Sequence, residues 1–212
     1  MKILALDSSG STASAAILDD YITLAEASCT SAKKHTETLL PMVDGLFSVT
    51  GISPQQLDYI AVTSGPGSFT GLRIAAAAAK GLAFGLGKQI IAVPTLDAMA
   101  YTVSAYGTWL LPMLDARRGQ VYSALYKADE PLNVQRVTDY LALPLDEMRQ
   151  LTATFSNKPL EIHDRLHAEF VGSAALTMLE NGQVTPSDEL PLLYIRKPQA
   201  EREREAKCSS QT

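Results

Sequence analysis

The stretch that decides the fold is Thr63–Arg73, TSGPGSFTGLR, which joins an apolar run to an alanine-rich run. The apolar run, Leu57–Val62, predicts a strand, and Thr70–Leu86 predicts a helix. A glycine-rich turn between a strand and a helix can aim backbone N–H groups and a helix N-terminus at an anion. The stretch therefore predicts an α/β unit, with a candidate anion site at its turn.

This turn does not match either of two common nucleotide-binding loops. A Walker A loop has Gly-Lys-Ser/Thr at its end, and the dinucleotide fingerprint has glycine at its sixth position. Gly65 and Gly67 can face a phosphate, or they can supply the unusual backbone angles of a tight turn, with Ser68 or Thr70 capping the helix. The residues alone leave both interpretations open.

The pattern on either side extends the α/β interpretation. Three successive strands are expected first, and helices and strands then alternate, as in parallel α/β units. The expected segments are Lys2–Asp7, Ala13–Leu18, Tyr21–Ser28, Lys33–Val49, Gln89–Val93, Thr95–Tyr106, Trp109–Asp115, Gln120–Tyr126, Leu145–Phe155 and Val171–Glu180. A soft boundary between Pro94 and Tyr106 divides the chain into an N-terminal lobe, residues 1–100, and a smaller, less regular lobe, residues 101–212. The charged run at residues 199–207 is expected to be a solvated helix end or tail.

Two of the expected helices carry more apolar surface than one packing contact needs. At about 100° per residue, the apolar residues of Thr70–Leu86 lie on almost every side, and those of Lys33–Val49 span roughly half the circumference. The sheet can cover one side of each helix, and a partner protein can cover another. Alanine is also the best helix former, so an internal core helix is the alternative for Thr70–Leu86.

Composition restricts the classes of function. The chain has 212 residues and a formal net charge of −5, so its surface as a whole repels a phosphate backbone, and direct RNA binding is not expected. Its two cysteines, Cys29 and Cys208, indicate a reducing compartment, which we take to be the cytoplasm. No basic leader or apolar run of about 20 residues indicates secretion or a membrane span.

Metal and serine chemistry both lack the residues they need. His35 has Leu39 at the next helical turn, where a second metal ligand would stand. His163 and His167 share a helix face if that segment is helical, but no adjacent glutamate or third ligand accompanies them. Ser68 is not in a nucleophile elbow, because Thr70 replaces the required glycine. We expect no metal site and no independent protease activity.

Five motifs in order give the chain a family resemblance. They are DSS from Asp7, HTETLLP from His35, SGPGSFTGLR from Ser64, DARRGQVY from Asp115 and LYIRK from Leu193. In this order they resemble the bacterial TsaB (YeaZ) family, closely over the first 126 residues and thinly beyond. The resemblance implies the ribonuclease H-like α/β fold of actin, Hsp70 and sugar kinases, with two lobes built on mixed sheets flanked by helices.

The resemblance also implies a function. Members take part in forming N6-threonylcarbamoyladenosine next to the anticodon of tRNAs that read codons starting with A, as a non-catalytic scaffold for a TsaD-like catalytic subunit. The resemblance also implies a TsaE-like ATPase in the complex and a homodimer when the chain is alone. It implies that the chain contacts tRNA only indirectly. The implied partner interface comprises His35, Thr36, Leu39, Leu40, Met42, Val43, Leu46, Phe47, Leu72, Arg73, Ala76, Ala77 and Lys80.

The phosphate-facing positions of the wider superfamily survive only in part. The matching positions are Asp7, Ser8, Gly65, Gly67, Ser68 and Asp115. Arg117 and Arg118 follow Asp115 where active relatives have glycines, so we expect the chain alone to bind no cofactor and to have no catalytic residues. Whether ATP or ADP binds at the joint with the partner stays open. The alternative function is an actin-type ATPase or small-molecule kinase that uses Asp7, Asp115 and the Gly65–Gly71 loop. A third hypothesis is a metallopeptidase.

Overall fold

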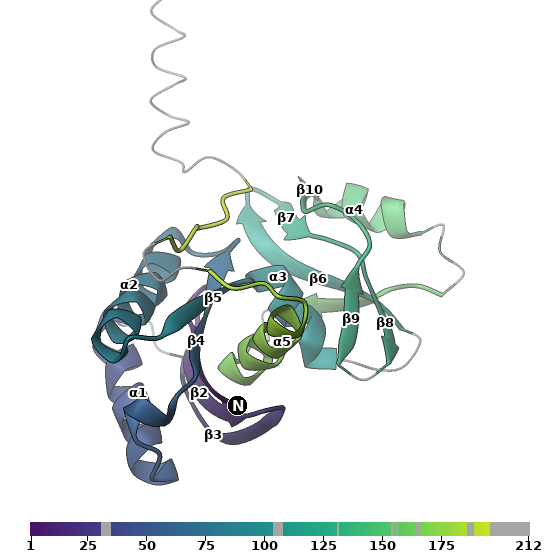
Figure 1. Ribbon diagram of the computed structural model, residues 1–212. Coiled ribbons are helices and arrows are strands. Elements are labelled where there is room, and N and C mark those ends of the chain that lie inside the picture. The colour runs from purple at the N-terminus through teal and green to yellow at the C-terminus, as the bar shows by residue number, and fades with distance from the viewer. Residues whose placement is uncertain are drawn as a thin grey trace, which may run out of the picture.

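Two β-sheets with helices on their faces form the body of the molecule (Figure 1). The structure is a computed structural model that describes residues 1–30, 35–103, 108–130, 132–153, 155, 157–163, 166–185 and 189–195. The first sheet has the strand order β3-β2-β1-β4-β5, and the second has the order β10-β7-β6-β8-β9 with β11 paired to β6. The sheets come from successive parts of the sequence, so the α/β expectation is confirmed.

The first sheet begins with the expected three-strand meander and continues in parallel. β2 pairs antiparallel with both β1 and β3, whereas β4 lies parallel to β1 and to β5. The bounds are β1 Lys2–Asp7, β2 Ala13–Asp19, β3 Ile22–Cys29, β4 Tyr59–Gly65 and β5 Gln89–Pro94. Each of the five expected strands in this region is confirmed to within a few residues.

Both faces of this sheet are covered by helices, which is why β1 is apolar at successive positions. Leu4 and Leu6 face the helices α1 and α2, while Ile3 and Ala5 face α3 and α5. The helices, with two short 3₁₀ turns, are α1 His35–Thr50, η1 Pro54–Gln56, α2 Phe69–Leu86, α3 Thr95–Ala100, η2 Tyr101–Val103 and α5 Ala168–Glu180. The expected starting point Lys33 and end point Tyr106 lie outside the described residues.

The second sheet differs more from expectation. The single strand expected over Gln120–Tyr126 is two strands, because the chain leaves the ladder at Ala124 and Leu125. Three further strands were not predicted, since each has only four residues and too few positions for an alternating pattern. The elements are β6 Thr108–Arg117, β7 Gln120–Ser123, β8 Tyr126–Glu130, β9 Asn133–Arg136, β10 Leu141–Pro144, α4 Leu145–Thr152 and β11 Leu160–His163.

The helix α5 connects the two parts of the chain. It follows the second sheet in sequence but packs on β1 and β2 of the first sheet. Gly172 permits this approach, because a Cβ at this position would lie 2.4 Å from Leu18 Cδ1. The lobe boundary near residue 100 stays a prediction, and residues 199–207 lie outside the described part of the chain.

The histidines at 163 and 167 do not share a helix. His163 ends β11, and His167 is the N-cap residue of α5. His163 Nε2 lies 3.3 Å from Glu161, while His167 Nδ1 lies 3.4 Å from Glu26 on β3. The condition for a common helix face, a helical segment that contains both histidines, is therefore not met. Among the described residues, no group of three His, Cys, Asp or Glu side chains could hold a metal.

Candidate functional site

The glycine turn and the turn after β1 pack directly against each other. Ser68 N–H donates to Ser9 O at 2.7 Å, and Ser8 Oγ donates to Gly71 O at 2.8 Å. A Cβ on Gly71 would lie 1.8 Å from the Ser8 carbonyl oxygen, and one on Gly67 would lie 2.6 Å from that of Ser9. These two glycines are thus required for close backbone contact, which is the tight-turn interpretation.

Asp7 lies beneath this contact and is only 1% exposed. Its Oδ1 accepts hydrogen bonds from Ser9 N–H at 3.0 Å and Thr63 Oγ1 at 2.7 Å. Burial raises the pKa of Asp7, although these hydrogen bonds oppose the shift. Among the described residues, the buried hydroxyls Ser14 Oγ and Thr95 Oγ1 have no hydrogen-bond partner. The Asp7 carboxyl is therefore enclosed in this chain, and its phosphate-facing role stays a prediction.

Asp115 occupies a different environment from Asp7. It lies on β6 of the second sheet with an exposed side chain, and its Oδ1 accepts from Arg117 N–H at 2.7 Å. Arg117, Arg118 and Gly119 all have positive φ in the turn to β7. Asp115 therefore shapes a hairpin turn, and within the described residues it forms no hydrogen bond with Asp7, Ser9 or Thr63.

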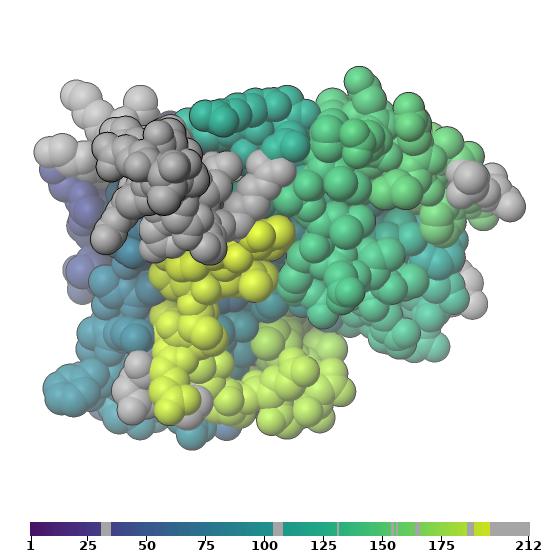
Figure 2. Space-filling view, turned by 90° about the horizontal axis from the view of Figure 1, so that it is seen from above, coloured from purple at the N-terminus to yellow at the C-terminus, as the bar shows by residue number. Residues whose placement is uncertain are grey.

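The chain near its C-terminal end returns to the glycine turn, which the sequence pattern did not predict. Leu193 N–H donates to Ser64 O at 2.7 Å, and a Cβ on Gly65, whose φ is +116°, would lie 2.4 Å from Leu193 O. The Tyr194 ring lies 5.8 Å from that of Phe69. In Figure 2 this yellow segment runs between the blue first part of the chain and the green second part.

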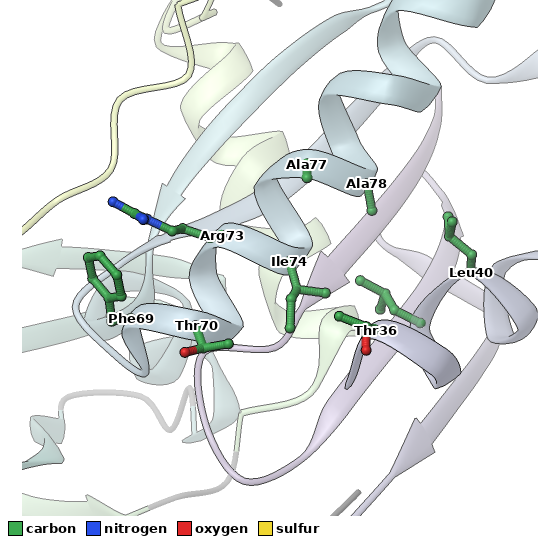
Figure 3. A pocket seen from close by; sticks show the side chains of 9 residues that line it. Thr36, Leu40, Phe69, Thr70, Arg73, Ile74, Ala77 and Ala78 are labelled. Atoms are coloured by element: carbon green, nitrogen blue, oxygen red, sulfur yellow. The ribbon is translucent and has the colours of Figure 1, made fainter. Parts of the chain in front are cut away.

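An apolar groove lies on the outer side of the first sheet, between α1 and α2. It encloses about 580 Å³ and is lined from α1 by Thr36, Leu39 and Leu40 and from α2 by Phe69, Thr70, Arg73, Ile74, Ala77 and Ala78. Ile74 and Ala78 point toward α1, whereas Phe69 and Arg73 point to the other side of α2 (Figure 3). The Arg73 guanidinium stacks on the Phe69 ring at 3.8 Å, so this cation has an aromatic partner.

The predicted partner residues separate into an inner set and an outer set. The inner set packs in the core of this chain and comprises Leu39, Val43, Leu46, Leu72 and Ala76. Leu39 also lines the floor of the groove, and a contact of this set with a partner stays a prediction. Thr36, Leu40, Arg73 and Ala77 are exposed, and His35, Met42, Phe47 and Lys80 are partly exposed. His35 Nε2 lies 3.3 Å from Gly10 O, which anchors the start of α1.

Sequence reasoning missed several exposed apolar residues on the same two helices. Phe84 on α2 is 90% exposed and Val49 on α1 is 81% exposed, while Phe69, Thr70, Ile74 and Ala78 line the groove. The signal available in the sequence was a phenylalanine, Phe84, within an otherwise alanine-rich helix. Within the described part of the chain, α2 is long and apolar enough to cross a membrane by length and composition alone. Core helices of soluble proteins meet the same two criteria.

These features define an α/β protein with two mixed sheets flanked by helices, a buried aspartate at the turn after β1 and an apolar groove on its outer helices. The chain belongs to the family described as "TsaD: tRNA N6-adenosine threonylcarbamoyltransferase", whose model matches residues 29–185. It is similar over 92% of its length to the structure of YeaZ from Pseudomonas aeruginosa, with a TM-score of 0.79, 25% identity and coverage of 99% of that chain.

Curated relatives carry the TsaB name. The chain is 37% identical over 151 residues to the "tRNA threonylcarbamoyladenosine biosynthesis protein TsaB" of Bacillus subtilis, covering 71% of this chain and 66% of that protein. The Escherichia coli protein of the same name is 37% identical over 137 residues, covering 61% of this chain and 57% of that protein. The matches thus span about two thirds or less of these relatives. The resemblance to the TsaB (YeaZ) family is confirmed.

Proposed function

We propose that this chain acts in tRNA threonylcarbamoyladenosine biosynthesis by binding another protein through the groove between α1 and α2. The observation that carries this proposal is the groove itself, which joins exposed apolar side chains from both helices. Soluble monomers rarely leave such contiguous apolar surface uncovered. The names of the TsaB relatives supply the pathway, and the enclosed Asp7 favours a binding role over catalysis by this chain alone.

We further propose that the partner is a TsaD-like catalytic subunit and that the chain is its scaffold. A second copy would cover the same groove when the chain is alone, and a TsaE-like ATPase would join the complex. The net charge of −5 supports contact with tRNA through the partner instead of directly. A nucleotide, ATP or ADP, would bind at the joint with the partner, and the complex would work in the cytoplasm.

The test is an arginine placed in the groove. Ala77→Arg adds a long charged side chain at an exposed position, so the fold should survive and assembly should fail. The matched control is Gln150→Arg, which adds the same side chain to exposed α4 on the second sheet. Size-exclusion chromatography with light scattering, alone and with a TsaD-like subunit, measures assembly. Quantifying threonylcarbamoyladenosine in tRNA from cells measures function.

We expect Ala77→Arg to abolish both the self-associated state and the mixed complex, with tRNA modification lost, while Gln150→Arg changes none of them. Intact assembly and modification with Ala77→Arg would place the interface elsewhere. Robust ATP turnover by the isolated chain, abolished by Asp7→Ala, would instead support the actin-type ATPase or kinase.

A further inference from the structure

A second pocket lies on the opposite face of the first sheet from the groove. It encloses about 110 Å³ and is bounded by α3, η2, α5 and the strands β8 and β9. α3 and α5 pack on the first sheet, while β8 and β9 belong to the second, so the pocket lies where the two sheets meet. Small-molecule sites occur preferentially at such junctions.

A carboxylate with one uncommitted oxygen faces this pocket. Asp97 Oδ1 accepts from Tyr126 Oη at 2.6 Å and from Tyr140 Oη at 2.9 Å, whereas Oδ2 receives no hydrogen bond from a described residue. Burial raises the pKa of Asp97, with both tyrosine hydroxyls and the charge of Arg136 opposing the shift. A carboxylate oxygen in this setting is stabilised by a donor, and most strongly by a cationic one.

Arg136 lines the same pocket. Its guanidinium stacks on the Tyr140 ring at 4.0 Å, and within the described residues it forms no ion pair with a carboxylate. The charge of Arg136 lowers the pKa of Asp97, yet the two side chains form no ion pair. Opposite charges thus line one small cavity with space between them.

The remaining lining distinguishes the two ends of the pocket. Thr177 and Asn181 come from the last turn of α5, whose C-terminal end carries partial negative charge and favours a cation. Val134, Ala174 and Met178 supply apolar surface. The pocket therefore offers a negative end, a positive guanidinium and an apolar wall.

We propose that this pocket binds a small free α-amino acid. The ammonium group donates to Asp97 Oδ2, the carboxylate lies against Arg136, and a short side chain packs on the apolar wall. The size restricts the ligand to the smallest amino acids, because one water occupies roughly 30 Å³ in the liquid and the cavity encloses only about 110 Å³. A ligand bound here would link α5 and α3 to the second sheet.

The test measures binding to the full chain by NMR chemical-shift titration, confirmed by calorimetry. The probes are glycine, L-alanine and L-serine, each compared with its amide, which lacks the carboxylate, and its N-acetyl form, which lacks the ammonium. We expect shifts at Thr177 and Asn181 with the free amino acids, and binding at least about tenfold weaker for both blocked forms, since each loses a charge-assisted contact.

Two variants separate binding from folding. Asp97→Asn keeps an oxygen acceptor for both tyrosines but removes the charge, and Arg136→Gln changes an exposed side chain. Each should weaken amino-acid binding about tenfold or more, while Arg118→Gln, in the exposed β6–β7 turn, should leave it unchanged. No binding of any probe at millimolar concentration would overturn the proposal, as would binding that persists in both variants or equal binding of the blocked forms.

Discussion

At the scale of single residues, the glycines of the turn after β4 are explained by what they touch. Gly71 lies in α2, where glycine is a poor helix former, yet the Ser8 carbonyl oxygen occupies the space of a side chain. The pattern predicted that these glycines matter. It could not distinguish phosphate binding from a tight turn, because the deciding atoms belong to Ser8 and Ser9, far away in the sequence.

The substitution Gly71→Ala should destabilise the protein strongly. The new Cβ would lie 1.8 Å from a backbone oxygen that no rotamer change can move, so we expect a loss of about 3 kcal/mol or more in unfolding free energy. Gly81→Ala in the same helix meets nothing within 4 Å and should stabilise by roughly 0.5–1 kcal/mol. Urea denaturation of both variants measures the difference, and equal effects would refute the contact.

Gly172 offers a milder case. Its neighbour is the end of the Leu18 side chain, which can rotate away, so Gly172→Ala should cost only about 1–3 kcal/mol. Chemical denaturation measures this loss directly. A loss equal to that of Gly71→Ala would show that Leu18 is held rigidly in place.

At the scale of elements, α1 places two neighbouring leucines in opposite environments, one buried and one exposed. Leu39 is 1% exposed against the first sheet, and Leu40 is 49% exposed in the groove. The apolar arc predicted from the sequence was wide enough for two covering surfaces. It did not say which residues face the sheet, because the rotation of a helix about its axis is set by packing with β2 and β3.

Alanine substitutions at these two positions should therefore have opposite signatures. Leu39→Ala leaves a cavity in the core and should cost about 2–5 kcal/mol of stability. Leu40→Ala should change stability by less than about 0.5 kcal/mol but weaken assembly. Denaturation curves and sedimentation velocity, run on both variants, test this. Undiminished assembly of Leu40→Ala would remove that side chain from the interface.

At the scale of the whole molecule, the two sheets were predicted unequally. The first sheet has apolar strands and long helices, whose patterns are unambiguous. In the second sheet, β9, β10 and β11 have four residues each, and their pairing depends on distant partners such as β6 and β7. The packing of α5 on the first sheet could not be predicted either. Its signal is Gly172, and the reason for a glycine there is contact with Leu18, which is far away in the sequence.

Stability should depend on pH through two groups with opposite shifts. The pKa of Asp7 is raised by burial, so the native state binds that proton more tightly, and the contribution of Asp7 falls as pH rises above about 4 through the raised pKa. The pKa of Asp19 is lowered by hydrogen bonds from Lys2 and the N-terminal amine. Its contribution is present above about pH 4 and is lost as pH falls through the lowered pKa.

Two asparagine variants make this prediction measurable. Asp7→Asn should gain stability relative to the parent chain as pH rises, because it keeps an acceptor for Ser9 and Thr63 without a buried charge. Asp19→Asn should be less stable than the parent near neutral pH and equal to it at low pH. Urea denaturation between about pH 3 and pH 8 gives both curves, and parallel curves for the two variants would contradict the assigned shifts.

The hydrogen bond between Leu193 and Ser64 also concerns the newly made chain. Ribosomes add roughly 5–20 residues per second, so about 130 residues separate the synthesis of these two partners by roughly 6–25 s. During that interval the first sheet can assemble, but the backbone of Leu193, which later covers Gly65, has not yet been made. The glycine turn is therefore among the last parts of the molecule to mature on the ribosome, long after the helices that flank it.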